Sequence, residues 1–378
     1  MQPFEVNWSE QQIRVVKEKV ARTALPIAPE DAGWGMGADP EFLRAFQTYW
    51  SQEFDFVAAV HRLNKYPQFL TDIDGVQIHF VHVFGESVEA RPLLLTHGWP
   101  GSHLEFWGVI DRLTQPSRYG GSPDDAFSVV VPSLPGYGFS GRPRVPIGPR
   151  AVAAMWRRLM TETLGYESFY AQGGDWGSAV ASQLGVHHGD VVRGIHLNMP
   201  FLTLRPQEAH SAEESDWGQR FASTQALLGD YARLQMHRPL SIGWATADNP
   251  LGQAAWILER FHDWADQRHR SFEEVFSLED LVTNVSLYVM TENFASALWL
   301  YRGYIDEERS AGAEFCATPT GYAAFPGDAL FPPPPLSLLS RSYNIAYFSE
   351  PERGGHFAAW EVPELFAADL VTWARHIS

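Results

Sequence analysis

The stretch that decides the fold is Tyr170-Ala171-Gln172-Gly173-Gly174-Asp175-Trp176-Gly177-Ser178. Its apolar start predicts the end of a strand, its glycines predict a tight turn, and the residues from Trp176 onward predict the start of a helix. Gly173 and Gly177 stand two residues before and after Asp175. Small residues at this spacing let the chain turn sharply enough to expose the side chain between them.

A strand, a sharp turn and a helix with an exposed central side chain form the nucleophile elbow of α/β-hydrolases. Most such elbows carry serine, but this one carries Asp175, and the chain contains no Gly-x-Ser-x-Gly segment. A carboxylate attacks a saturated carbon that bears a leaving group, and it leaves an ester that water must cleave. An ordinary Gly/Asp turn is the alternative, and the flanking strand and helix patterns make it the less favoured one.

Five further segments have the pattern of strands, and helical patterns separate most of them. A mostly parallel central sheet with helices on both faces is therefore the expected architecture, which is the α/β-hydrolase fold. The segments are Val76 to Val83, Pro92 to Thr96, Phe127 to Pro132, Val192 to Asn198 and Tyr343 to Phe348.

The order of the patterns also predicts a domain organisation. Residues 1–75 carry three helical patterns and form an expected N-terminal helical appendage. Residues 76–200 and 305–378 supply the two parts of the α/β core. The strand pattern disappears in residues 201–304, so we expect a helical cap over the active site there.

Composition excludes several classes of protein. The 378 residues are 45% hydrophobic and 19% charged, as in ordinary globular proteins. A formal net charge of −17 argues against binding to nucleic acid or to anionic membranes. No signal peptide or run of 18 apolar residues is visible, so we expect a soluble, cytoplasmic protein. The single cysteine, Cys316, cannot form an intrachain disulfide, and it is expected to be a small apolar residue near a strand.

An ester on Asp175 needs a base that activates water, and in this fold a histidine follows the last strand. His356, in Arg353-Gly354-Gly355-His356-Phe357, has this position. Asp328, in a loop after a strand expected near 321–325, is the predicted acid that orients His356. Glu350 and Glu352 remain alternatives for the acid.

The segment His97-Gly98-Trp99-Pro100-Gly101-Ser102 follows a buried strand and suits an oxyanion hole. The backbone N–H groups of Trp99 and Trp176 are the predicted donors. The alternative is that this segment has no catalytic role and is only a tight turn with a cis bond before Pro100.

Together these motifs resemble the microsomal-type epoxide hydrolases, including the juvenile-hormone epoxide hydrolases, over nearly the whole chain. The segment Asn64 to Phe69 resembles the end of that family's N-terminal region. The resemblance implies that two cap tyrosines, Tyr231 and Tyr301, donate hydrogen bonds to the epoxide oxygen. Unlike the microsomal members, the chain is expected to carry no membrane anchor, and it differs from some relatives by having Asp rather than Glu at position 328.

The predicted activity is hydrolysis of a bulky apolar or aromatic epoxide to a vicinal diol, in natural-product biosynthesis or detoxification. The alternatives are a haloalkane dehalogenase and a non-catalytic binding protein on the same fold. The expected partners are the epoxide and water, with no metal or organic cofactor. Whether the chain forms a homo-oligomer is left open.

Overall fold

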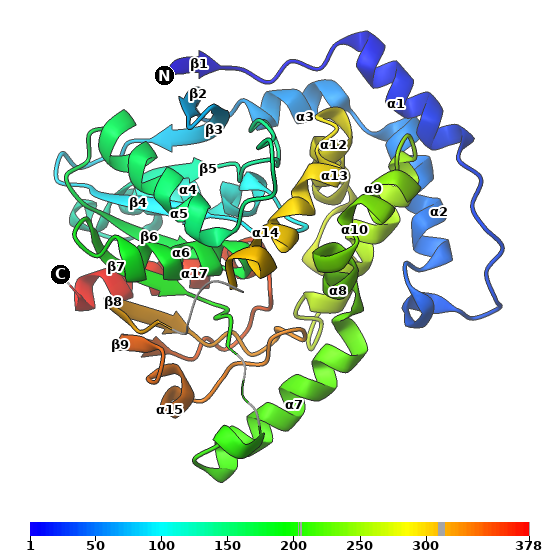
Figure 1. Cartoon of the computed structure of the whole chain (residues 1–378). Coiled ribbons are helices and arrows are strands. Elements are labelled where there is room, and N and C mark those ends of the chain that lie inside the picture. Colours follow the sequence, from blue (N-terminus) through cyan, green and yellow to red (C-terminus); the bar gives the residue numbers. More distant parts are fainter. Residues whose placement is uncertain (203, 205, 309–313, 378) are drawn as a thin grey trace.

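The computed structural model describes residues 1–202, 204, 206–308 and 314–377, and its centre is a nine-stranded sheet (Figure 1). The strand order is β1-β2-β3-β5-β4-β6-β7-β8-β9. The strands are β1 (Gln2–Phe4), β2 (Gln68–Ile73), β3 (Val76–Val83), β4 (Arg91–Thr96), β5 (Phe127–Pro132), β6 (Phe169–Gly173), β7 (Val192–Leu197), β8 (Cys316–Ala323) and β9 (Tyr343–Ser349).

The sheet is parallel from β5 to β9 and antiparallel at its β1–β2–β3 edge. The central strand β4 lies between β5 and β6, with Leu94 opposite Val130 on one side and Ala171 on the other. The carboxyl ends of β4 and β6 are therefore neighbours. Loops at the carboxyl ends of adjacent parallel strands are where active sites form in such sheets.

Helices cover both faces of the sheet, as the α/β-hydrolase fold requires. Helices α5 (Pro149–Arg158) and α6 (Asp175–His187) pack on one face, and α4 (Trp107–Thr114) and α17 (Pro363–His376) on the other. Leu94 belongs to the apolar core on the α5–α6 side, whereas Leu93 and Leu95 belong to the core on the α4–α17 side. This alternation explains why β4 is an uninterrupted apolar run, because both faces of the strand are buried.

The N-terminal region contains the three predicted helices, α1 (Glu10–Arg22), α2 (Pro40–Thr48) and α3 (Phe56–Leu63). Ser9 caps α1 in a capping box with Gln12. The region is not only helical, however. The strand β1 precedes α1 and pairs with β2, which joins the start of the chain to the sheet edge.

The helices between β7 and β8 form the cap beside the carboxyl ends of the strands (Figure 1). They are α7 (Ala212–Leu228), α8 (Asp230–His237), α9 (Pro239–Ala245), α10 (Pro250–Trp264), α11 (Phe272–Val275), α12 (Leu278–Met290), α13 (Phe294–Ala297) and α14 (Trp299–Glu308). Helix α1 packs on α10 and α12, so the N-terminal region supports the cap. The predicted helical cap is confirmed, while the domain boundaries at residues 75, 200 and 304 stay a prediction.

Two short helices, α15 (Leu336–Leu339) and α16 (Ala358–Glu361), flank the C-terminal loops.

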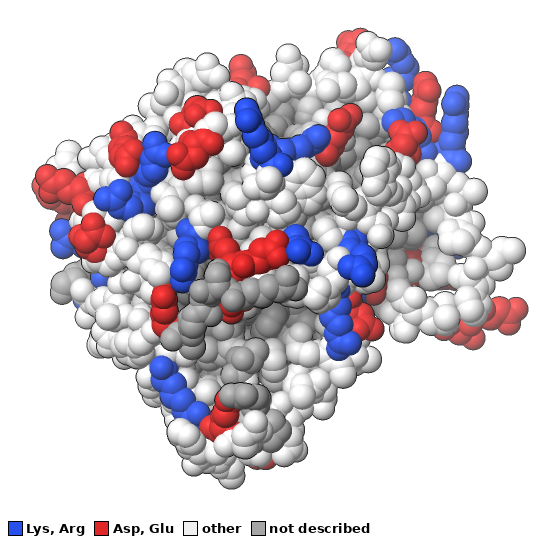
Figure 2. Space-filling model, in the orientation of Figure 1, with Lys and Arg blue, Asp and Glu red and all other residues white. Residues whose placement is uncertain are grey.

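Acidic and basic side chains are interspersed over the face of the molecule shown in Figure 2. Among the described residues, no helix has both the length and the apolar character that crossing a bilayer requires.

Candidate active site

Asp175 stands at the turn between β6 and α6, where the sequence predicts the nucleophile elbow. Its φ of 46° lies in the left-handed region, which non-glycine residues rarely adopt. A Cβ on Gly173 would come within 2.0 Å of the Gly177 carbonyl oxygen, and a Cβ on Gly177 within 1.8 Å of the Thr96 oxygen. Only glycine allows this close approach, so the two glycines make the sharp turn at Asp175 possible.

The carboxylate of Asp175 is held from the β4 side. The backbone N–H of Trp99 donates a 2.8 Å hydrogen bond to Asp175 Oδ1. The N–H of Trp176 lies in the first turn of α6, where backbone donors have no acceptor within the helix. Of the two predicted oxyanion donors, the Trp99 N–H therefore contacts the carboxylate, and the Trp176 N–H has no acceptor within its own helix.

Cap helix α12 fixes the loop that carries Trp99. The Trp99–Pro100 bond is cis, as the sequence allows. Asn284 donates to the Pro100 carbonyl oxygen at 2.9 Å, and the Tyr288 hydroxyl donates to the Gly101 carbonyl oxygen at 2.6 Å. The position of the Trp99 amide thus depends on the cap as well as on the sheet.

His356 lies between two carboxylates. Its Nδ1 is 3.0 Å from Asp328 Oδ2, and its Nε2 is 3.4 Å from Asp175 Oδ2. The first contact is a hydrogen bond, whereas the second is an ion pair, and Nε2 has no hydrogen-bond partner among the described residues. Asp328 also accepts the backbone N–H groups of Leu330 and Phe331 on Oδ1, which fixes its orientation.

Of the three carboxylates considered as the acid, Asp328 is the one in contact with His356. Glu350 and Glu352 are exposed to solvent. Asp328 follows β8, which ends at Ala323 and begins at Cys316, earlier than the strand expected near 321–325.

The charges around His356 determine its protonation. Burial opposes the charged imidazole, but the negative charges of Asp328 and Asp175 outweigh burial and raise the pKa of His356 to about 10. With both carboxylates ionised, the imidazole therefore carries a proton at neutral pH.

Tyr231 in α8 and Tyr301 in α14 converge on Asp175 from the cap. Their ring centroids are 6.1 Å apart, and Tyr301 packs edge-on against Trp176 with centroids 4.6 Å apart. The hydroxyl of Tyr301 is buried and has no hydrogen-bond partner among the described residues. Burial, and then the charge of Asp175, raises the pKa of Tyr231; burial likewise raises that of Tyr301, so both phenols keep their protons.

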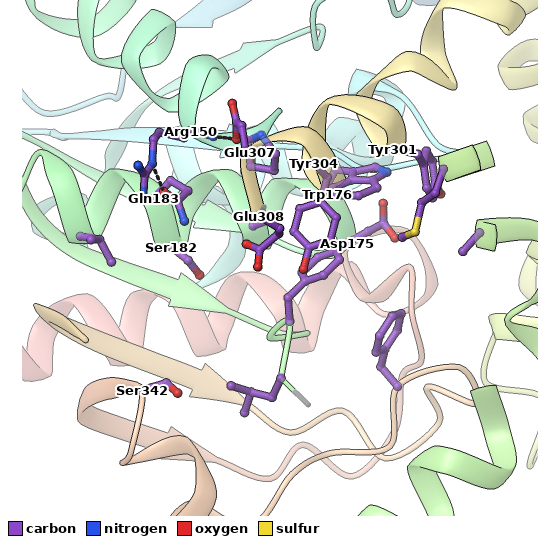
Figure 3. Close-up of a pocket in the computed structure, with 18 of the residues that line it drawn as sticks. Arg150, Asp175, Trp176, Ser182, Gln183, Tyr301, Tyr304, Glu307, Glu308 and Ser342 are labelled. Atoms are coloured by element: carbon purple, nitrogen blue, oxygen red, sulfur yellow. Dashed lines mark hydrogen bonds between the residues drawn. The ribbon is translucent and has the colours of Figure 1, made fainter. Parts of the chain in front are cut away.

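A cavity of about 510 Å³ opens from these residues. Figure 3 shows Asp175, Trp176 and Tyr301 towards one end and Arg150 and Gln183 towards the other. Aromatic side chains form much of the wall near Asp175, and polar side chains lie farther away. The aromatic residues that line the cavity are Trp176, Phe201, Phe221, Tyr231, Tyr301, Tyr304, Phe331 and Tyr343.

Cys316 also lines this cavity, from the start of β8. It is buried, and burial raises the pKa of its thiol, so the reactive thiolate is disfavoured. This is the environment of a packing residue, as expected from the sequence.

The sequence did not indicate a titratable group, Glu105, that lies beside the site. Glu105 follows the Trp99 loop, and a Cβ on Gly101 would come within 1.8 Å of Glu105 Oε1, so the absence of a side chain at Gly101 leaves room for this carboxyl. Oε1 is buried without a hydrogen-bond partner among the described residues. Burial raises the pKa of Glu105 to about 8, against the charge of His356, which favours the ionised form.

Comparison with known proteins decides the family. Residues 1–106 match the family model described as the epoxide hydrolase N terminus, and residues 91–249 match the α/β-hydrolase fold. Epoxide hydrolase 1 of Sus scrofa is 33% identical over 98% of this chain and 87% of its own length. The chain belongs to the epoxide hydrolase family.

Solved structures of epoxide hydrolases agree with this conclusion over the whole chain. The juvenile hormone epoxide hydrolase of the silkworm Bombyx mori superposes with a TM-score of 0.89 at 29% identity, covering 100% of this chain and 94% of that one. The Aspergillus niger epoxide hydrolase has a TM-score of 0.85 at 31% identity, with coverages of 100% and 96%. The family and fold predicted from the sequence are confirmed, and this chain is an epoxide hydrolase.

Proposed function

We propose that this epoxide hydrolase converts a bulky apolar or aromatic epoxide to a vicinal diol through a covalent ester on Asp175. The observation that carries the proposal is that the two oxygens of the Asp175 carboxylate have different surroundings. Oδ1 accepts the Trp99 N–H, and Oδ2 lies on the side of His356. One oxygen is thus held in place while the other is available for attack.

In the first half-reaction, Oδ2 of Asp175 attacks a ring carbon and one carbon–oxygen bond of the oxirane breaks. Tyr231 and Tyr301 donate hydrogen bonds to the departing oxygen, which takes up a proton and becomes a hydroxyl group. Their raised pKa values keep the phenols protonated in the resting site. The buried, unpaired hydroxyl of Tyr301 is a donor that a substrate oxygen can satisfy.

Ester formation prepares His356 for the second half-reaction. The negative charge of Asp175 is one of the causes that raise the pKa of His356, and the ester is neutral. Loss of this charge lowers the pKa, so His356 gives up its proton, which balances the proton gained by the product hydroxyl. The neutral imidazole, oriented by Asp328, is then a base for water.

Water attacks Cγ of the ester and transfers a proton to Nε2 of His356. Negative charge develops on Oδ1, next to the Trp99 and Trp176 amides, which is where an oxyanion hole lowers the barrier. The bond between Cγ and the substrate-linked Oδ2 breaks, and that oxygen takes the remaining proton of the attacking water as the diol leaves. The carboxylate and the protonated His356 are restored, so the cycle consumes one epoxide and one water.

The cavity supports the substrate class. Its wall near Asp175 is aromatic, and its volume of about 510 Å³ lies within the range for drug-sized ligands. An epoxide with an aromatic or extended apolar substituent would bury that substituent against Trp176, Phe201 and Tyr304. Small epoxides would leave most of this wall in contact with water.

A haloalkane dehalogenase is the second candidate, because a departing halide is stabilised by N–H donors and this site contains such donors. The indole N–H groups of Trp99 and Trp176 are buried without partners among the described residues. The two phenols favour an epoxide oxygen as the leaving group, since it must gain a proton.

Turnover of styrene oxide beside 1-bromohexane tests the choice. Diol formation without bromide release is the expected result, and bromide release without diol formation would overturn the proposal. Asp175→Asn should abolish the covalent adduct and diol formation, whereas Asp248→Asn at an exposed position should retain both.

A further inference from the structure

His356 lies in a loop of residues 354–357. Each of the four backbone N–H groups of this loop donates a hydrogen bond, either to Glu361 of α16 or to an acceptor in the cap segment that contains Trp264 and Asp266. The N–H groups of Gly355 and Phe357, on either side of His356, donate to Glu361 at 3.0 and 2.8 Å. The N–H groups of Gly354 and His356 donate to Asp266 Oδ2 at 2.9 Å and to the Trp264 carbonyl oxygen at 3.2 Å. Four consecutive donors are thus fixed, two by α16 and two by the cap.

Glu361 and Asp266 are also bonded to each other. The backbone N–H of Asp266 donates to Glu361 Oε2 at 2.8 Å, so this carboxylate accepts three backbone N–H groups on two oxygens. Both side chains are buried, with 4% of each residue exposed. Asp266 lies two residues after the end of cap helix α10, and Glu361 is the last residue of α16.

The surroundings leave no room for a different arrangement. A Cβ on Gly355 would lie 2.6 Å from the Asp266 nitrogen and 3.0 Å from both oxygens of Glu361. A Cβ on Gly327, in the loop before Asp328, would lie 2.3 Å from Asp266 Cγ. The absence of a side chain at Gly355 and Gly327 therefore lets the backbone of both loops pack directly against Asp266 and Glu361. Neither of these two carboxylates contacts Asp175.

We propose that Glu361, joined through Asp266 to the cap, is a positioning residue that aims His356 at the ester and thereby controls the second half-reaction. This inference rests on the covalent pathway proposed above. Attack of Asp175 on the epoxide does not need the base, whereas water activation needs Nε2 within reach of the ester carbon. A displacement of about 1 Å at a reacting group can lower a rate by roughly 100-fold.

Glu361→Gln is the decisive variant because a glutamine has one acceptor oxygen. Its NH₂ group would face a backbone N–H donor, so one side of the His356 loop would lose its acceptor. Glu364→Gln is the matched control, since Glu364 is three residues away, more than half exposed and paired with Arg112 on the surface. Single-turnover quench-flow with styrene oxide, followed by mass spectrometry of the Asp175 peptide, measures ester formation and ester hydrolysis separately.

We expect Glu361→Gln to form the ester within about twofold of the wild-type rate and to hydrolyse it roughly tenfold or more slowly, so that the adduct accumulates. Glu364→Gln should match the wild type in both steps. Equal slowing of both steps, or no slowing of hydrolysis, would overturn the positioning role. If the wild-type enzyme forms no ester at all, the covalent pathway fails instead, and the two failures are distinguishable.

A second variant decides the matter if Glu361→Gln does not fold. Arg268 is partly exposed and holds both oxygens of Asp266 at 2.8 Å. Arg268→Gln should loosen Asp266 and slow ester hydrolysis selectively, by a few fold. Wild-type hydrolysis rates in that variant would contradict the coupling between the cap and His356.

Discussion

The backbone amide of Trp99 donates a 2.8 Å hydrogen bond to Oδ1 of Asp175, across the carboxyl ends of the neighbouring strands β4 and β6. In the resting enzyme this amide orients the carboxylate. In the proposed pathway the same amide stabilises negative charge on the same oxygen when water attacks the ester. One backbone contact therefore connects the two half-reactions.

Replacement of His356 by glutamine should separate the half-reactions. Attack by Asp175 does not need a base, so the ester should form, but its hydrolysis should slow by roughly 10²–10⁴-fold. Intact-mass measurement after mixing with styrene oxide should show a stable adduct. Rapid turnover without an adduct would exclude His356 as the base.

Removal of either cap hydroxyl should act on the first half-reaction. Tyr301→Phe and Tyr231→Phe should each slow ester formation by roughly 10²-fold, the usual effect of losing one donor to a developing oxyanion. Tyr304→Phe is the control, because Tyr304 lines the same cavity one helical turn from Tyr301. Equal rates in the Tyr301 and Tyr304 variants would exclude a role for the Tyr301 hydroxyl.

The elbow should not tolerate a methyl group at Gly177. The Cβ would lie 1.8 Å from the Thr96 carbonyl oxygen, so the end of β4 and the first turn of α6 must separate. We expect Gly177→Ala to lower the free energy of unfolding by about 3 kcal/mol or more in urea titration. Gly35→Ala is the control, because its Cβ meets no atom within 4 Å. Matching urea midpoints for the two variants would show that the elbow is not sterically constrained.

His82 should make stability depend on pH. It lies in β3 with 7% of its surface exposed, its Nε2 is 2.8 Å from the Tyr166 hydroxyl, and burial lowers its pKa to about 4. In the unfolded chain the pKa is about 6.5, so the unfolded state binds the proton first as the pH falls. The contribution of neutral His82 is complete above pH 6.5 and is lost as the pH falls towards 4, at up to about 1.4 kcal/mol per pH unit.

Comparison of variants isolates this effect from other titrating groups. The difference in unfolding free energy between wild type and His82→Gln should shrink between pH 6.5 and 4. His61→Gln, at an exposed helix position, should follow the wild type throughout. A constant difference for His82→Gln would show that His82 does not titrate with folding.

The sequence predicts best those elements whose local residue pattern matches their burial in the fold. The apolar run of β4 and the glycines beside Asp175 are local signals, and both elements are where they were expected. Strand β1 was missed because it is three residues long and is stabilised by pairing with β2, more than sixty residues away. No local pattern reveals such an edge pairing.

In the candidate site too, residues within local motifs were predicted, and residues placed only by tertiary contacts were not. Asp175 and His356 stand in motifs, and Asp328 was preferred over two glutamates that are nearer to His356 in sequence. Glu105 and Asp266 were missed because their environment comes from folding. Asp266 is on a cap segment ninety residues from His356, and only the tertiary structure brings it to that loop.

Isotope labelling tests the central claim, the covalent ester on Asp175, most directly. A single turnover of styrene oxide by excess enzyme in H₂¹⁸O should place ¹⁸O in the Asp175 carboxylate and none in the diol, because water attacks Cγ and the diol leaves with Oδ2. Mass spectrometry of the diol and of the Asp175 peptide measures both. Appearance of ¹⁸O in the diol during this first turnover, with an unlabelled Asp175, would show direct attack of water on the epoxide and contradict the account.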